Sequence, residues 1–138
     1  MKRVIFDTGP LGAWLCPRDE HHAWVRQMFQ QVAPGSMVCE AVLAEACHLA
    51  AKEAVSHARF IKFVRRVRLQ PLSLANKLEA LGALLERYAD APMDFADACV
   101  VRLAELHPEA TVCTTDTDFR FYRKNDREGI PFLAPFAP

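Results

Sequence analysis

The sequence predicts a mixed α/β fold in which a short parallel sheet is covered by helices. Short segments of apolar and β-branched residues alternate along the chain with longer segments that have the composition and apolar spacing of helices. The short segments are too apolar to have one face in water, which is typical of parallel strands buried under helices. The chain has 138 residues, of which 51% are hydrophobic, so it can bury a sizeable core. We therefore expect a single domain over residues 1–138.

The N-terminal part is expected to contain one strand and two helices. Arg3–Phe6 has the apolar character of a short buried strand, and Asp7-Thr8-Gly9-Pro10 has the composition of a turn. A short helix is expected over Pro10–Cys16. A second helix is expected to begin at an N-cap on Asp19 and to end at about Val32.

The rest of the chain continues the alternation of strands and helices. The expected strands are Met37–Cys39 and the β-branched segment Thr111–Thr115, with a brief extended segment over Val67–Leu72. Ser56 is the expected N-cap of a helix with Phe60, Ile61 and Val64 on its apolar face. The remaining elements are expected at Glu40–Ala54, Leu74–Asp90 and Asp94–His107 as helices, and near Pro131–Leu133 as a short apolar stretch.

Composition argues against several classes of protein. The 17 basic and 17 acidic side chains cancel, which disfavours a protein that coats nucleic acid through a large positive surface. No apolar run approaches the ~20 residues that a membrane span needs, and no signal peptide is visible. The five cysteines include no C-x-x-C pair, which favours reduced core residues in a cytoplasmic protein over a zinc cluster.

Acidic residues occupy positions that suit a common site. Asp7 and Asp116 directly follow predicted strands, and Asp118 lies two residues further on. Ligands of parallel sheets bind at the carboxyl ends of the strands. Glu45 borders the apolar face of its predicted helix, and Asp97 lies in the first turn of another. Each acid alone has an ordinary explanation as a turn, capping or solvated residue, but the set indicates one acidic cleft.

Such a cleft requires cations, because neighbouring carboxylates repel one another unless positive charge lies between them. Hard oxygen ligands favour Mg²⁺ or Mn²⁺, and divalent ions among carboxylates typically serve phosphoryl transfer. Asp94 lies three residues before Asp97 on the same predicted helix. It could share the site, but we favour a role as the N-cap of that helix.

Four short segments of the chain form an ordered set of motifs. The most specific feature of the set is the T-x-D-x-D-F sequence after a strand, together with an Asp-Ala pair on the preceding helix. The segments are Val4-Ile5-Phe6-Asp7-Thr8-Gly9-Pro10-Leu11, Ala44-Glu45-Ala46, Phe95-Ala96-Asp97-Ala98 and Thr114-Thr115-Asp116-Thr117-Asp118-Phe119.

In order, spacing and total length, this set resembles the PIN-domain ribonucleases, in particular the VapC-type toxins of type II toxin–antitoxin systems. The resemblance implies an α/β/α sandwich with a short central parallel sheet, and an endoribonuclease that depends on Mg²⁺ or Mn²⁺. Metal-activated water would attack the phosphodiester in line and leave a 5′-phosphate and a 3′-hydroxyl. The implied site is an acidic quartet of Asp7, Glu45, Asp97 and Asp116, with Asp118 as an accessory acid and Thr8 and Thr115 as neighbours that orient a ligand or water.

The resemblance also implies binding partners. Relatives act on RNA, such as a transfer RNA or a ribosomal RNA loop, usually form homodimers and often pair with a small inhibitory antitoxin protein. A solvated surface explains the basic residues of the predicted loops as well as RNA contact does. These residues are Arg18, Arg120, Arg123, Lys124 and Arg127.

Other classes share single motifs with the chain. Asp7-Thr8-Gly9 matches the D-T-G of aspartic proteases, but their fold is almost entirely β. Glu45-Ala46-Cys47-His48 has the E-x-x-H spacing of di-iron bundles, which need two such motifs. A phosphatase of the haloacid dehalogenase type needs D-x-D after the first strand, where this chain has D-T-G. The alternative from a different class is a non-catalytic PIN-like scaffold or protein-interaction module, and the presence of all four acids argues against it.

Overall fold

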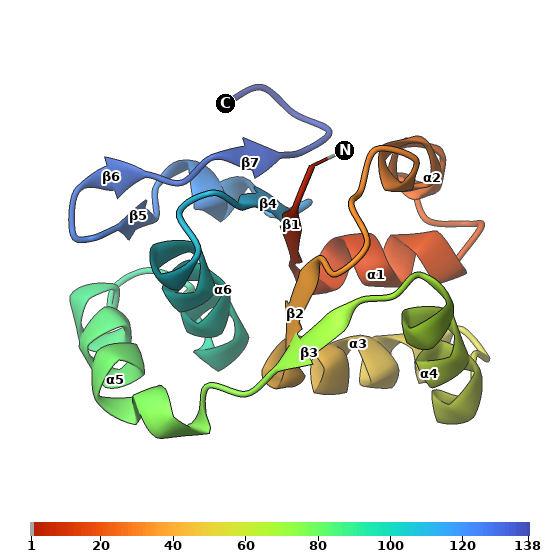
Figure 1. The fold of residues 1–138 in the computed structure, drawn as a ribbon, viewed down its shortest axis with the longest axis horizontal. Coiled ribbons are helices and arrows are strands. Elements are labelled where there is room, and N and C mark those ends of the chain that lie inside the picture. Colours follow the sequence, from red (N-terminus) through yellow and green to blue (C-terminus); the bar gives the residue numbers. More distant parts are fainter. Residues whose placement is uncertain (1) are drawn as a thin grey trace.

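The computed structural model describes residues 2–138 and confirms the predicted mixed α/β class (Figure 1). Five short strands form one sheet in the order β3-β2-β1-β4-β7, and every neighbouring pair is parallel. A separate antiparallel hairpin pairs β5 with β6. The strands are β1 (Val4–Phe6), β2 (Met37–Cys39), β3 (Gln70–Leu72), β4 (Thr111–Cys113), β5 (Arg123–Lys124), β6 (Glu128–Gly129) and β7 (Phe132–Leu133).

Helices cover the sheet on both sides (Figure 1). On one side, α6 (Phe95–Leu106) packs against β1, β2 and β4, and α5 (Leu78–Arg87) packs against α6. On the other side, α1 (Thr8–Leu15) packs against α2 (His22–Phe29) and α3 (Glu40–Lys52). The helix α4 (His57–Arg66) packs against α3, and α3 also reaches α6. This arrangement is the sandwich that the sequence motifs imply.

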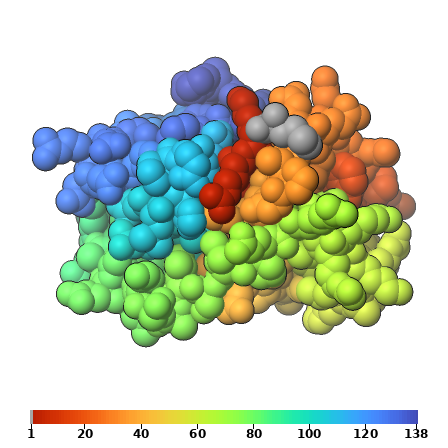
Figure 2. Space-filling model, in the orientation of Figure 1, coloured from red at the N-terminus to blue at the C-terminus, as the bar shows by residue number. Residues whose placement is uncertain are grey.

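The sheet and α6 form the centre of the core. All residues of β1 and β2 are buried, as is most of α6. In the space-filling view, the N-terminal segment in red lies between the orange segment that contains β2 and the cyan segment that contains α6 (Figure 2). All five cysteines are free thiols. Cys39, Cys99 and Cys113 are buried in the core, as predicted, whereas Cys16 and Cys47 are only half-buried. Within residues 2–138, no helix has both the length and the apolar character needed to cross a bilayer.

The predicted turn after β1 is wrong, because α1 begins directly at Thr8. Asp7 is the N-cap of this helix, and its Oδ1 accepts a hydrogen bond of 2.8 Å from the Thr8 backbone N–H. Pro10 lies in the first turn, where a helix has no use for its missing N–H, so it is compatible with helix. A Cβ atom on Gly9 would collide with the Thr115 hydroxyl, so this glycine permits close packing of α1 on the segment after β4.

The second helix is shorter than predicted. The helix begins at His22 and ends at Phe29. It begins later than predicted because Asp19 forms a turn before the helix and is not its N-cap. The Asp19 carboxylate accepts from the backbone N–H of His21, and the Asp19 carbonyl accepts from the backbone N–H of His22. The other predicted caps are confirmed: the Ser56 hydroxyl accepts from the Arg59 N–H, and Asp94 caps α6.

The second half of the chain contains more separate elements than predicted. The helix expected over Leu74–Asp90 divides into a 3₁₀ turn, η1 (Ala75–Lys77), and α5. A second 3₁₀ turn, η2 (Thr117–Arg120), follows β4 and is capped by Asp116. Asn125 and Asp126 have φ values of 49° and 69°, which give the β5–β6 hairpin its tight turn. The apolar stretch predicted near Pro131–Leu133 forms the edge strand β7 of the sheet.

Candidate active site

Three carboxylates meet at the carboxyl edge of the sheet. Asp7 follows β1 and Asp116 follows the neighbouring strand β4, while Asp97 lies in the first turn of α6, which packs across both strands. One carboxylate oxygen from each of the three lies within 4.8 Å of the other two. We call Asp7, Asp97 and Asp116 the acidic triad.

The conformation of Asp7 is determined by two hydrogen bonds. Its Oδ1 accepts from the Thr8 backbone N–H, and its Oδ2 accepts from the Thr114 hydroxyl at 2.7 Å. The backbone N–H of Asp7 donates to the Cys113 carbonyl at 2.9 Å, which extends the β1–β4 pairing to the site itself. Only 5% of Asp7 is exposed. The sheet therefore positions this carboxylate as rigidly as it positions the strand residues.

Asp97 is positioned by a capping box at the start of α6. The Asp97 N–H donates to Asp94 Oδ1 at 2.8 Å, and Asp97 Oδ2 accepts from the Asp94 backbone N–H at 3.1 Å. Asp94 is therefore the helix N-cap, as predicted. These reciprocal bonds fix Asp97 at the start of α6 through only one of its two carboxylate oxygens.

Thr114 connects Asp7 to Asp116. Its hydroxyl donates to Asp7 and accepts from the Asp116 backbone N–H at 2.9 Å. Asp116 Oδ1 in turn accepts from the Asp118 N–H at 2.9 Å. The sequence motif drew attention to Thr115, but the hydroxyl that holds the two acids together belongs to Thr114. Thr114 belongs to the same sequence motif, but nothing in the sequence distinguished it from Thr115.

The triad is electrostatically strained. Burial raises the pKa of Asp7 from its ordinary value of 3.8 to about 6, against the lowering effect of its hydrogen bonds from Thr114 and Thr8. Burial also raises the pKa of Asp97 to about 7, and the charges of Asp94, Asp7 and Asp116 add to this shift. Two carboxyls thus titrate near neutral pH because their charged forms lack compensation.

The residues present fit a divalent cation. In the part of the chain that the structure describes, every ion pair lies elsewhere, and none brings Lys, Arg or His to the acidic triad. Buried carboxylates without a cationic partner are costly unless they are protonated or bind a metal. An all-oxygen donor set of this kind suits Mg²⁺ or Mn²⁺.

A family model described as PIN domain matches residues 4–125, which include every residue of the acidic triad. This chain belongs to the PIN domain family. The match confirms the resemblance that the sequence motifs indicated. No curated protein sequence matches the chain.

Two solved structures show the same fold as this PIN domain. VapC20 from Mycobacterium tuberculosis, described as a sarcin–ricin loop cleaving toxin, has a TM-score of 0.73 and 19% identity. The match covers 83% of this chain and 91% of that chain. A toxin–antitoxin complex from Klebsiella pneumoniae has a TM-score of 0.65 and 20% identity, covering 98% of this chain and 99% of that chain. At such identities the similarity shows a shared fold.

Glu45 and Asp118 lie at the periphery of the triad. Glu45 is half-buried on α3, and its pKa is raised by burial and by the charge of Asp94. Its own charge raises the pKa of Asp7, so its carboxylate lies within electrostatic range of the site. The pKa of Asp118 is raised by burial and by the charge of Asp116. Neither residue belongs to the triad.

Within the described part of the chain, two hydroxyl groups near the site are buried without a hydrogen-bond partner, which the sequence did not predict. The hydroxyls of Tyr122 and Thr8 are buried, and each lacks a hydrogen-bond partner within residues 2–138. Burial and the charges of Asp97, Asp118 and Asp116 raise the pKa of Tyr122, so this phenol remains protonated beside the acids. The sequence named Thr8 as an orienting neighbour, but it is the Thr8 backbone N–H and not its hydroxyl that contacts Asp7. The sequence contained no signal for Tyr122.

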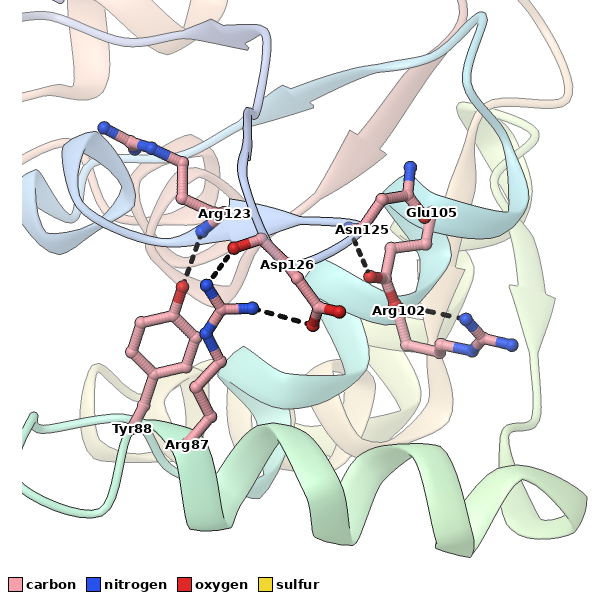
Figure 3. Close-up of polar contacts among 7 residues, drawn as sticks. All are labelled: Arg87, Tyr88, Arg102, Glu105, Arg123, Asn125 and Asp126. Atoms are coloured by element: carbon pink, nitrogen blue, oxygen red, sulfur yellow. Dashed lines mark hydrogen bonds and ion pairs between the residues drawn. The ribbon is translucent and has the colours of Figure 1, made fainter.

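The basic residues proposed for RNA contact do not form one free cluster. Arg18 is exposed in the loop between α1 and α2, and Arg127 is exposed in the hairpin. The Arg120 guanidinium donates to the Ala137 carbonyl and lies 4.7 Å from the centre of the Phe136 ring. Arg123 donates through Nη1 to the carbonyls of Arg120 and Tyr122, and its backbone N–H donates to the Tyr88 hydroxyl (Figure 3).

Lys124 does not lie in an exposed loop, so its predicted position is wrong. The side chain belongs to β5 and is only 7% exposed, because β5 packs against α6. The segment looked like a polar loop because its sequence is dominated by charged residues, whereas the alternation of β5 turns Lys124 inward.

Proposed function

We propose that this PIN domain is a divalent-metal-dependent endoribonuclease and the toxin of a toxin–antitoxin pair. The observation that carries the proposal is the acidic triad, whose oxygens lie within 4.8 Å of one another. Within residues 2–138, no ion pair supplies these acids with a cationic partner. Family membership and the fold shared with VapC20 support the same activity. The acids that would serve catalysis and metal binding are Asp7, Asp97 and Asp116, with Glu45 and Asp118 as accessory acids.

Asp7, Asp97 and Asp116 would hold Mg²⁺ or Mn²⁺, and such an ion would lower the pKa of a water and offset the charge of a phosphodiester. The chain's own contribution is to hold three carboxylates in place. Thr8 and Thr114 orient Asp7, the Asp94 backbone orients Asp97, and the Asp118 backbone orients Asp116. Outer hydrogen bonds of this kind keep ligands in a binding geometry before the ion arrives.

The substrate and partners follow from the same proposal. VapC20 is described as cleaving the sarcin–ricin loop, so a structured RNA loop or a transfer RNA is the substrate class to test first. A toxin–antitoxin complex shares the fold over nearly the full length of both chains, which supports a small antitoxin protein as partner. A homodimer in the cytoplasm completes the proposal.

The test is cleavage of a panel of folded RNAs by the purified protein in Mg²⁺, in Mn²⁺ and in EDTA. Wild type is expected to cut at least one RNA only when the metal is present. Asp97→Asn is expected to abolish cutting, whereas Asp126→Asn, the same change on the exposed hairpin turn, is expected to leave it intact. Equal cleavage by wild type and Asp97→Asn would sink the proposal. So would the absence of cleavage together with equal Mn²⁺ affinity for both proteins in calorimetry.

A further inference from the structure

Two aromatic side chains are exceptions to the burial of the others. Within residues 2–138, Phe95 and Phe121 are the exposed aromatic residues, at 47% and 70%. Both are close in sequence to the acids of the site. Phe95 directly follows Asp94, and Phe121 lies three residues after Asp118, whose carbonyl accepts its backbone N–H. A single exposed apolar side chain is ordinary on a protein surface, but Phe95 differs from the others because it lines a groove next to an exposed apolar neighbour, Leu78.

Phe95 lines a groove between the β2–α3 junction, the segment around η1 and α6. The groove has a volume of about 400 Å³, which lies within the range of small-ligand sites. Its walls are mainly apolar, and the polar residues in its lining are Glu40, Ser73 and Cys39. The lining comes from the β2–α3 junction, from the segment around η1, and from Phe95 and Cys99 on one face of α6.

The groove and the triad share one edge of the sheet. Cys39 ends β2, which is the neighbour of β1, and Asp7 follows β1 on the same side. Phe6 pairs with Val38, so Asp7 and Cys39 are the next residues in register and their backbones lie about one strand spacing, ~4.8 Å, apart. A single nucleotide can span this distance, with its phosphate at the carboxylates and its base in the groove.

We propose that this groove binds an unpaired nucleobase next to the scissile phosphodiester, with the base stacked on Phe95. The inference rests on the proposed ribonuclease function and specifies its substrate as a nucleotide splayed out of a loop. Proteins that recognise single-stranded RNA stack unpaired bases on aromatic rings. The Glu40 carboxylate can only accept hydrogen bonds, which favours bases with an exocyclic amino group over uracil, whose single base donor is its N3–H.

The first test measures RNA binding without cleavage. Short single-stranded RNAs that carry 2-aminopurine at successive positions are titrated into the Asp97→Asn protein in Mg²⁺. Adding Phe95→Ala is expected to weaken binding about tenfold and to remove the fluorescence quenching at one position, whereas Phe95→Trp retains both. Ile61→Ala, an exposed apolar residue on α4, is the matched control and is expected to change neither.

Other outcomes overturn the proposal. Unchanged affinity in Phe95→Ala, or no binding of any RNA, removes the base site. A change of oligomeric state in light scattering, with RNA affinity unaltered, assigns the groove to a second copy of the chain. If Phe95→Ala loses binding to a protein partner while its RNA affinity is unchanged, the groove is assigned to that partner.

Cleavage by the otherwise wild-type protein separates this inference from the proposed function. If wild type and Phe95→Ala cut RNA with equal KM and kcat, the base site fails while the nuclease stands. If RNA binding depends on Phe95 but no metal supports cleavage, the nuclease fails while the base site stands. The joint expectation is a higher KM for Phe95→Ala, together with a shift in base preference at the same nucleotide for Glu40→Gln.

Discussion

The charged side chains at the carboxyl edge of the sheet and those around the β5–β6 hairpin follow opposite arrangements. At the edge, Asp7, Asp97 and Asp116 come within 4.8 Å of one another and accept hydrogen bonds from uncharged donors. Around the hairpin, Asp126 pairs with Arg87 and Glu105 pairs with Arg102 (Figure 3). Acidic side chains therefore repel one another at the edge of the sheet, whereas around the hairpin they hold neighbouring elements together.

The hairpin contacts connect it to the helices on which it rests. Arg87 at the end of α5 pairs with Asp126 at 2.7 Å and also donates to the Asp126 carbonyl. Glu105 on α6 accepts from Arg102 at 3.1 Å and from the Asn125 backbone N–H at 2.6 Å. Each of the two carboxylates is thus paired with a guanidinium, although the buried Nε of Arg102 has no hydrogen-bond partner within residues 2–138. The edge carboxylates have the opposite property, since a cation would relieve their repulsion.

The largest expected effect comes from removing one acid of the triad. Asp116→Asn keeps an oxygen that can accept from the Asp118 N–H, so the local turn is retained while a negative charge is lost. We expect cleavage to fall by about 10³-fold or more, since metal coordination supplies several kcal/mol of transition-state stabilisation. Glu105→Gln in the hairpin region is the contrast, and its RNA cleavage rate should match that of wild type. A comparable loss in both variants would remove the distinction between the two regions.

The next largest effect concerns stability and pH. In the folded protein Asp7 and Asp97 have pKa values of about 6 and about 7, whereas their ordinary value is 3.8. Between pH 3.8 and pH 7 the folded state therefore binds more protons than the unfolded state. The free energy of unfolding therefore decreases by roughly a few kcal/mol as the pH rises from about 4 to about 7.

Thermal unfolding in EDTA at pH 5 and pH 8 measures this fall. We expect a Tm lower by roughly 5–15 °C at pH 8 and substantial recovery when Mn²⁺ is added. Asp97→Asn should be less sensitive to both pH and Mn²⁺ than wild type. A wild-type Tm that rises between pH 5 and pH 8 in EDTA would contradict the electrostatic account.

A smaller effect is expected at the periphery of the site. Glu45 lies outside the triad but within range of its charges. Glu45→Gln should reduce cleavage by about 10- to 100-fold, as is typical for groups around a metal site, and should raise the Mg²⁺ concentration needed for half-maximal rate. Metal titrations of the cleavage rate would show this. A loss as large as that of Asp116→Asn would place Glu45 among the direct ligands.

The smallest effect belongs to the exposed ion pair of the hairpin. Arg87→Ala removes a contact whose acidic partner is almost fully exposed, so we expect a loss of less than about 1 kcal/mol in the free energy of unfolding. Urea titration measures this change, and RNA cleavage should be unaltered. A larger destabilisation would mean that the hairpin depends on this one contact.

Much of the fold could be predicted from local patterns. The apolar strands, the Ser56 and Asp94 caps and the apolar faces of the helices depend on neighbours a few residues away. The errors arose where a local signal had two physical meanings. Asp7-Thr8-Gly9-Pro10 has turn composition, yet the same residues make an N-cap and a first helical turn. Lys124 has loop composition, yet its strand packs on α6.

Periodicity, capping and short ordered segments were enough to predict most of the helices, the strands β1, β2 and β4, the acidic motifs and the family. Which acids meet is a property of tertiary packing. Asp7, Asp97 and Asp116 are brought together by the parallel register of β1 and β4 and by the packing of α6 across them. The same packing makes Thr114 the link between two of these acids and leaves Phe95 exposed beside them. Contacts between residues a hundred positions apart depend on strand order and helix packing, which no local pattern encodes.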